Sequence, residues 1–239
     1  MPNLIRFGTG GRGASISAPI IGEDFNWTGG DGTYQVLDDG GGNWRIKFLS
    51  SGTFTPLKNM VIDVFLVGAG GGSGYSYCGA GGSGYTATVR SVVLAANTAY
   101  PIVVGAAGAN GSNSTNGGET TAFSASAAGG KRSANGTSSR ITAGGNGGSG
   151  GGGGVGSSGK VAGGTDGSDG TDSTSKGGTG QGTTTREFGE ADGDLYASGG
   201  GSNLTASVTN SGNGGCFSTT SIAPADGIVV IRQHKEAAA

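Results

Sequence analysis

The sequence predicts an all-β protein, in which a small antiparallel β scaffold carries an inserted glycine-rich body of bundled polyglycine II helices. Three observations predict this fold class. Apolar, β-branched runs typical of strands gather toward the two ends of the chain. Glycine supplies 57 of the 239 residues, whereas its usual share is about 7%. No 3.6-residue apolar stripe predicts a helix, and each glycine would weaken one by about 1 kcal/mol relative to alanine.

The scaffold strands are recognised by their patterns. In "NWRIKFL" (43–49) apolar and charged residues alternate, as in a half-buried strand, and the turn-forming "DDGGGN" precedes it. Residues 33–49 are therefore expected to form a hairpin. The run "MVIDVFLV" (60–67) is nearly all apolar, which suits a strand covered on both faces. Further strands are expected at 84–94, 100–105 and 227–232.

The domain organisation follows from these runs, because they bracket the glycine-rich region. The simplest arrangement is an insertion that leaves the scaffold after Val104 and returns at Gly227. We expect an N-terminal arm (1–22), a β scaffold (23–104, completed by strand 227–232), a glycine-rich polyglycine II region (105–226) and a C-terminal tail (233–239).

The glycine-rich region contains a three-residue period, most clearly in "GGNGGSGGGGGVGSSGK" (144–160). A helix with three residues per turn places every third residue on one face. Collagen uses that period but needs abundant proline, and no proline occurs between Pro101 and Pro224. The pattern therefore predicts polyglycine II, in which neighbouring helices pair their backbone N–H and C=O groups. The glycines on the period are Gly144, Gly147, Gly150, Gly153, Gly156 and Gly159.

A flexible linker is the alternative interpretation, since chains rich in glycine and serine usually behave as coils. Ordering a residue costs about 1–2 kcal/mol, and a backbone hydrogen bond returns only about 0.5–1.5 kcal/mol. The repeat therefore needs many packed neighbours and a scaffold that fixes its ends. Apolar residues within the region favour order. They are Phe123, Ile141, Val155, Val161, Phe188, Leu195, Tyr196 and Phe217.

Charge and hydropathy exclude several classes of partner. The net charge is −2, whereas nucleic acid and anionic membranes are bound by strongly basic surfaces. No apolar run approaches the roughly 20 residues that span a bilayer, so we expect no membrane insertion. The opening "MPNLIRFGTGGRG" lacks the apolar stretch of a signal peptide. We therefore expect synthesis in the cytoplasm.

Two glycine motifs resemble phosphate-binding loops but lack the required context. "VIDVFLVGAGGGSG" begins like a dinucleotide fingerprint, yet no helix and no acidic residue follow at the required distances. "GVGSSGKV" (154–161) has Val161 where a P-loop needs serine or threonine. The sequence therefore predicts no cofactor.

Catalytic and metal-binding residues are also poorly represented, and we expect the protein not to be an enzyme. The single histidine, His234, lies in the expected tail, where we expect it to be solvated. A row of aspartates would repeat about every 9 Å along a threefold helix, too far apart to share one ion, so no metal site is expected. Whether Cys78 and Cys216 pair is left open. The aspartates are Asp166, Asp169 and Asp172.

Several segments, in this order, resemble glycine-rich domain proteins encoded in phages and prophages of gut bacteria. They include "YQVLDDGGGNWRIKFLSSGTFT", "DVFLVGAGGGSG", "TTREFGEADGDLYASGGG" and "GIVVIR". The resemblance covers about residues 30–232 and implies a tail-fibre or tail-tip component of the virion. The architecture also resembles that of polyglycine-sandwich adhesins, whose loops contact a host receptor. It implies a bacterial cell-surface receptor, glycan or protein, and other phage tail proteins as partners, and a homo-oligomer with a trimer favoured.

Aromatic residues outside the strands are the candidates for receptor binding, because their rings can stack on sugars. They are Tyr75 and Tyr77 in "SGYSYCG", and Phe188 and Tyr196. The alternative is that these rings cap glycine helices or pack at a subunit contact. Two other functions also stay open: a purely structural virion component without receptor contact, and an ice-binding protein built from polyglycine II helices.

Overall fold

The computed structural model describes most of the chain. The described residues are 18–75, 77–136, 142–153, 155–156, 159–160, 164, 185–201, 208–217 and 221–234. Most of the expected arm and tail, and the row of Asp166, Asp169 and Asp172, lie outside them.

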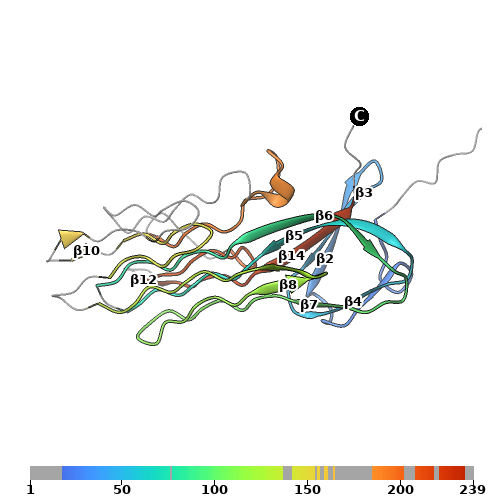
Figure 1. Cartoon of the computed structure of the whole chain (residues 1–239). Helices are drawn as coiled ribbons and strands as arrows, with labels where there is room; N and C mark the ends of the chain where they lie inside the picture. Colours follow the sequence, from blue (N-terminus) through green and yellow to red (C-terminus); the bar gives the residue numbers. More distant parts are fainter. Residues whose placement is uncertain are drawn as a thin grey trace, which may run out of the picture.

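Two antiparallel five-stranded sheets form the scaffold (Figure 1), which confirms the all-β fold class. The first sheet has the order β1 (Phe25–Trp27), β4 (Gly52–Pro56), β7 (Tyr100–Val103), β8 (Thr120–Ala122), β9 (Ala125–Ala127). The second has the order β2 (Tyr34–Gly40), β3 (Asn43–Phe48), β14 (Ile228–Gln233), β5 (Met60–Val67), β6 (Thr86–Leu94). The helical content of the described residues is limited to short 3-10 turns, including η2 (Glu187–Gly189).

The main core lies between the two sheets and is rich in aromatic rings. Phe25, Phe54 and Ile102 of the first sheet meet Phe48 and Ile231 of the second, all buried. Strand β5 is buried on both faces, as its apolar run predicts. One face joins this core, and the other joins a second cluster on the outer face of the sheet.

Strand register gives the scaffold two distinct ends. Strand β5 leads directly into the glycine-rich segments, and Ile228 pairs with its last residue, Val67, at what we call the body end. Gln233 pairs with Ile62 at the opposite, far end. Figure 1 shows the glycine-rich segments extending from the body end, away from the sheets. These segments form the glycine body.

Backbone hydrogen bonds in the glycine body repeat every three residues. In segment 68–73, Gly68 and Gly71 both donate to segment 82–85, and Ala69 and Gly72 both donate to segment 115–118. Segment 80–85 shows the same pattern with its own neighbours. Donors from 80–85 pair as follows: Ala80 and Ser83 with 149–152, Gly81 and Gly84 with 212–215, and Gly82 and Tyr85 with 128–131. A threefold helix requires this period, while the polyglycine II geometry itself stays a prediction.

Close packing in the body depends on the absence of side chains. A Cβ added to Gly81 would overlap the carbonyl oxygen of Gly71, and one added to Gly84 would overlap that of Gly68. Both segments are buried over most of their length. Glycine is therefore required here by the approach of neighbouring backbones rather than by a turn.

The boundary between scaffold and body differs from the sequence-based division. Residues 68–85 lie inside the body, although the sequence assigned them to the scaffold. Strands β8 and β9 lie in the region expected to be glycine helix, yet they extend the first sheet. The reason is that the chain crosses between the two parts several times rather than once.

Two further strand pairs are very short. They are β10 (Val155–Gly156) with β11 (Gly159–Lys160), and β12 (Cys216–Phe217) with β13 (Ser221–Ile222). No disulfide joins Cys78 to Cys216, both of which the structure describes.

Candidate functional site

Residues 185–197 form a turn that docks on the outer face of the second sheet, and we call it the docking turn. Phe188 and Tyr196 insert their rings against Phe65 of β5, with ring centroids 6.0 and 5.5 Å from the Phe65 centroid. Phe188 is 3% exposed and Tyr196 is 7% exposed. These two candidate binding residues therefore pack in the interior and offer no open ring face to a sugar.

A buried carboxylate fixes the docking turn to strand β3. Glu187, which is 2% exposed, lies 2.6 Å from the Arg45 guanidinium and 3.2 Å from the Lys47 ammonium. The Tyr196 hydroxyl donates to the same carboxylate over 3.0 Å. Lys47 also pairs with Asp194 at 2.8 Å. The charged residues that alternate with the apolar ones in β3 thus anchor a turn more than 130 residues away in sequence.

The pKa values in this cluster shift in the directions that the contacts dictate. The hydrogen bond from Lys47 is the main cause that lowers the pKa of Asp194. Burial would lower the pKa of Lys47, but hydrogen bonds to Asp194 and Tyr196 and the charge of Glu187 raise it. Burial and the negative charge of Glu187 raise the pKa of Tyr196 to about 12. Lys47 and Asp194 are therefore charged, and Tyr196 is neutral, at pH 7.

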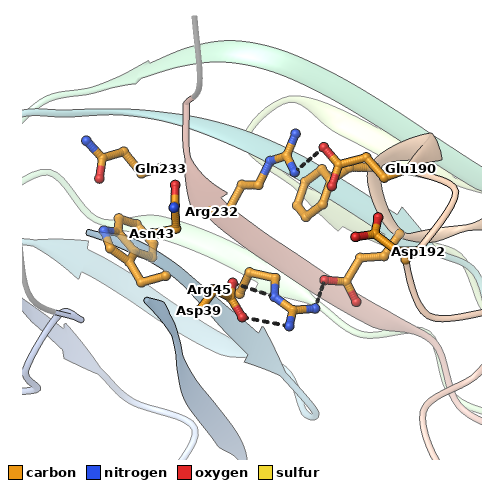
Figure 2. A pocket seen from close by; sticks show the side chains of 11 residues that line it. Asp39, Asn43, Arg45, Glu190, Asp192, Arg232 and Gln233 are labelled. Atoms are coloured by element: carbon orange, nitrogen blue, oxygen red, sulfur yellow. Dashed lines mark hydrogen bonds and ion pairs between the residues drawn. The ribbon is translucent and has the colours of Figure 1, made fainter. Parts of the chain in front are cut away.

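At the far end, a cavity of about 220 Å³ lies between the docking turn and the ends of β2, β3 and β14. We call it the junction cleft. Figure 2 shows the side chains that line it, with Arg45 and Arg232 each paired to carboxylates. The lining residues used below are Asp39, Asn43, Arg45, Glu190, Asp192 and Arg232.

The two guanidinium groups in the junction cleft are engaged by the protein's own carboxylates. Arg45 pairs with Asp39 and Glu187, and Arg232 pairs with Glu190 at 2.6 Å and with Asp63. The Arg232 guanidinium also lies 4.1 Å from the centroid of the Phe188 ring. Cationic side chains in the cleft are thus already neutralised, and they support the docking turn.

Acceptors in the junction cleft remain open. Asp192 makes no hydrogen bond or ion pair with any residue that the structure describes, and its side chain is exposed at the cleft. Glu190 uses one carboxylate oxygen for Arg232, and Asn43 uses its amide N–H for the carbonyl of Gly40. Carboxylates and amide oxygens accept hydrogen bonds, so the cleft suits a ligand that donates them.

Tyr75 and Tyr77 lie at the outer end of the glycine body, away from the scaffold. Segments 68–74 and 79–85 run antiparallel through the centre of the body, and residues 75–78 connect them at its end. We call this connection the tip turn. Tyr75 is 62% exposed and Tyr77 is 41% exposed. Tyr77 has φ +46°, an unusual conformation for a bulky residue. The structure therefore brings these two candidates together and separates them from Phe188 and Tyr196.

His234 is not the solvated tail residue that the sequence suggested. Its Nδ1 lies 2.6 Å from the buried Asp63 carboxylate, and its backbone extends the pairing of β14 with β5. Ser91 Oγ lies 3.1 Å from His234 Nε2 and 3.5 Å from Nδ1. Such similar distances place the hydroxyl against the ring rather than in line with the Nε2 lone pair, which a general base would use.

Asp63 is the centre of a structural ion cluster. It lies opposite a bulge in β6 and accepts hydrogen bonds from Arg90, Arg232, His234 and the Ser91 backbone. Burial raises its pKa, but these bonds and the charge of Arg232 outweigh burial and lower it. No sequence pattern marks this cluster, because its members come from three separate strands and the C-terminal segment.

These features define a class of protein: a β-sandwich that carries a buried, hydrogen-bonded glycine body on one end. A profile of the glycine-rich domain family matches residues 49–233, and the chain belongs to that family. No curated protein matches the chain. Among the described residues there is no helix long and apolar enough to cross a membrane.

Proposed function

We propose that this protein is a non-enzymatic receptor-binding component of a phage tail tip. Its tip turn contacts a receptor on the bacterial surface, a glycan or a protein, and the scaffold joins it to other tail proteins. The proposal includes assembly as a homo-oligomer, with a trimer favoured, in the virion. It rests on the resemblance of the sequence segments to phage-encoded glycine-rich proteins and on the placement of Tyr75 and Tyr77.

The observation that carries the proposal is the exposure of two tyrosine rings at the end of the body farthest from the scaffold. A tyrosine offers a large, rigid surface with a polar tip, which suits contacts to a partner. Both described chain ends, near Ala18 and His234, lie at the far end of the scaffold.

The body holds the tip turn in place. Segment 68–73 is hydrogen-bonded on all sides by other segments, including 82–85, 115–118 and 130–133. Tyr75 is fixed by a backbone bond of 2.8 Å to the Asn135 side chain. A preorganised surface loses less conformational entropy on binding, so it binds more tightly than a mobile loop with the same residues.

The experiment is binding of fluorescently labelled protein to intact cells from a panel of gut bacteria, with soluble cell-wall glycans as competitors. We expect saturable, strain-restricted and competable binding. A Tyr75→Ser/Tyr77→Asn double variant should bind at least about tenfold more weakly, which corresponds to about 1.4 kcal/mol. Asn suits the positive φ at position 77.

Val93→Ser is the matched control, because Val93 is an exposed apolar residue on the scaffold, 73% exposed. It should bind like the unaltered protein. Equal binding by the double variant and the control would contradict the assignment to the tip turn. A lack of binding to every strain would instead support a purely structural virion component.

A further inference from the structure

The part of the sequence that builds the tip turn and its neighbours is poor in acidic residues and contains a basic pair. Residues 68–165 contain a single acidic residue, Glu119, which directly precedes β8 of the scaffold. The stretch 120–165 contains four basic residues and no acidic one. Lys131 and Arg132 are two of the four, and both are exposed. A local excess of positive charge raises the local concentration of anionic ligands.

Arg132 differs from most arginines of the scaffold in its partners. Arg45, Arg90 and Arg232 each pair with a carboxylate. Arg132 makes no ion pair with any residue that the structure describes, and its guanidinium makes a long hydrogen bond of 3.4 Å to Ser114 Oγ. A guanidinium carries five N–H donors in a planar fork that fits a carboxylate or a phosphate group. Arg132 therefore has both charge and donors to offer an anion.

Arg132 lies close to the tip turn, because Asn135 connects the two. Arg132 and Asn135 contact the same turn, Arg132 at the Ser114 hydroxyl and Asn135 at the Ser112 carbonyl. The Asn135 amide oxygen also accepts a hydrogen bond of 2.8 Å from the Tyr75 backbone N–H. The three residues of chain from Arg132 to Asn135 span at most about 10 Å. The Arg132 guanidinium and the exposed Tyr75 ring therefore belong to one surface.

The other exposed groups of this surface are polar or aromatic. Ser112 and Asn113 are exposed at the turn that Arg132 contacts, and Tyr77 is exposed beside Tyr75. Hydroxyl and amide groups both donate and accept hydrogen bonds, as sugar hydroxyls do. A tyrosine ring offers a flat apolar face with a polar edge. Together with the guanidinium, these groups match a sugar that also carries a negative charge.

We propose that the tip turn and Arg132 bind an acidic glycan, a sugar polymer that carries carboxylate or phosphate groups. Arg132 donates to the anionic group, the Tyr75 ring stacks on a sugar ring, and the Asn113 amide bonds to a sugar hydroxyl. The inference rests on the proposed receptor binding, and it narrows the receptor from a glycan or a protein to a negatively charged glycan. It assigns to Arg132 a binding role that the packing of the glycine body does not require.

Binding of the full chain to three soluble polymers with one sugar backbone tests the inference. The probes are carboxymethyl dextran, dextran phosphate and uncharged dextran. We expect binding to at least one of the two anionic polymers, and that binding should weaken as NaCl rises from about 0.05 to about 0.5 M, because salt screens charge. The two anionic probes distinguish a carboxylate from a phosphate ligand. Binding to neither of them, or equally tight binding to uncharged dextran, would overturn the inference.

Arg132→Gln replaces the guanidinium by a neutral amide. It should weaken binding to the anionic polymer at least about tenfold and leave thermal unfolding unchanged, because the side chain is exposed. Arg132→Lys keeps the charge but loses the planar fork, so its affinity should be intermediate. Lys58→Gln is the matched control, since it makes the same change in net charge on the scaffold, where the Lys58 side chain is 71% exposed. It should bind like the unaltered protein.

The same variants in the cell-binding experiment separate this inference from the proposed function. If Arg132→Gln and the unaltered protein bound equally to a recognised strain, the acidic-glycan inference would be overturned and receptor binding would stand. Loss of binding after protease treatment of the cells would also overturn the inference, because the receptor would then be a protein. Binding that requires Arg132 and survives protease treatment would support it.

Discussion

Glu187 and Arg45 lie 142 residues apart in the sequence, and their side chains meet at 2.6 Å. The carboxylate is almost fully buried, whereas the guanidinium reaches it from the half-exposed outer face of the second sheet. Since Glu187 also contacts Lys47 and Tyr196, this one acid joins the docking turn to the scaffold. The docking turn then continues into glycine segments of the body.

Replacing Glu187 by glutamine should therefore destabilise the protein strongly. Glutamine keeps the shape but removes the buried charge partner of Arg45 and Lys47, which keep only their more exposed partners, Asp39 and Asp194. Breaking a buried ion pair in this way typically costs about 3–5 kcal/mol. The measurement is the free energy of unfolding from urea titrations at pH 7.

Asp39→Asn is the control for that measurement. Asp39 also binds Arg45, at 2.8 Å, but its side chain is 32% exposed. Exposed ion pairs contribute about 1 kcal/mol or less. If Asp39→Asn lowered the free energy of unfolding as much as Glu187→Gln does, burial would not be what makes Glu187 important.

Gly81→Ala should be among the most harmful single-methyl changes in this chain. The added Cβ would overlap the Gly71 carbonyl, which belongs to a buried neighbouring backbone that cannot withdraw without breaking hydrogen bonds. We expect the free energy of unfolding to fall by about 3 kcal/mol or more, which is the upper range for an overpacked core. Amide hydrogen exchange should show the loss of protection concentrated in segments 68–73 and 80–85.

Gly32→Ala separates steric overlap from backbone strain. Gly32 has φ +75°, and nothing lies within 4 Å of an added Cβ. Its cost should be only about 1–2 kcal/mol, from the left-handed conformation alone. If both variants lost the same stability, close packing of backbones would not be the reason for glycine in the body.

Much of the scaffold is predictable from the sequence, because its strands carry strong local patterns. The run 60–67 gives β5 with both ends correct, and the alternation in 43–49 gives β3 with Arg45 and Lys47 on the outer face. Strands β4, β8 and β9 of the first sheet were missed; "SSGTFTPL", which contains β4, reads as a turn because of its serines, glycine and proline. Strands β8 and β9 are only three residues long, and "TTAFSASA" has too few apolar residues for a period to be recognised.

The candidate sites were less accessible to sequence reasoning. Tyr75 is exposed and Tyr196 is buried. Whether a ring is exposed depends on which distant segment covers it, and no local sequence pattern predicts that. The junction cleft was also missed, since Arg45, Asp192 and Arg232 come from three separate regions. The one available signal was charge: an acidic stretch, 187–194, and outward-facing basic residues in strands of a protein with few charges.

Alkaline pH should destabilise the protein through Tyr196. Its pKa is raised to about 12 in the folded protein and is about 10 when unfolded. A raised pKa means that the folded state holds the proton more tightly than the unfolded state. The stabilisation that Tyr196 provides is therefore complete below pH 10 and is lost as the pH rises toward 12. The slope is about 1.4 kcal/mol per pH unit for this one group. Tyr196→Phe should show a shallower decline when unfolding free energies are compared between pH 9 and 11.5. Equal declines would contradict the assignment.

Ser124→Gly should stabilise the protein. Phe123 and Ser124 form the two-residue turn between β8 and β9, with φ of +50° and +64°. Such turns favour glycine, because a Cβ in this conformation costs about 1–2 kcal/mol. Ser124 is exposed, so no packing is lost. We expect the free energy of unfolding to rise by about 0.5–1 kcal/mol, after the greater entropy of glycine in the unfolded chain is subtracted.

Ser126→Gly, two residues later in β9, is the matched control. The φ of Ser126 is not positive, so the same change should cost about 0.5–1 kcal/mol of stability. Thermal unfolding of both variants checks the prediction, and a loss of stability in Ser124→Gly would mean that the serine conformation at this turn is not strained.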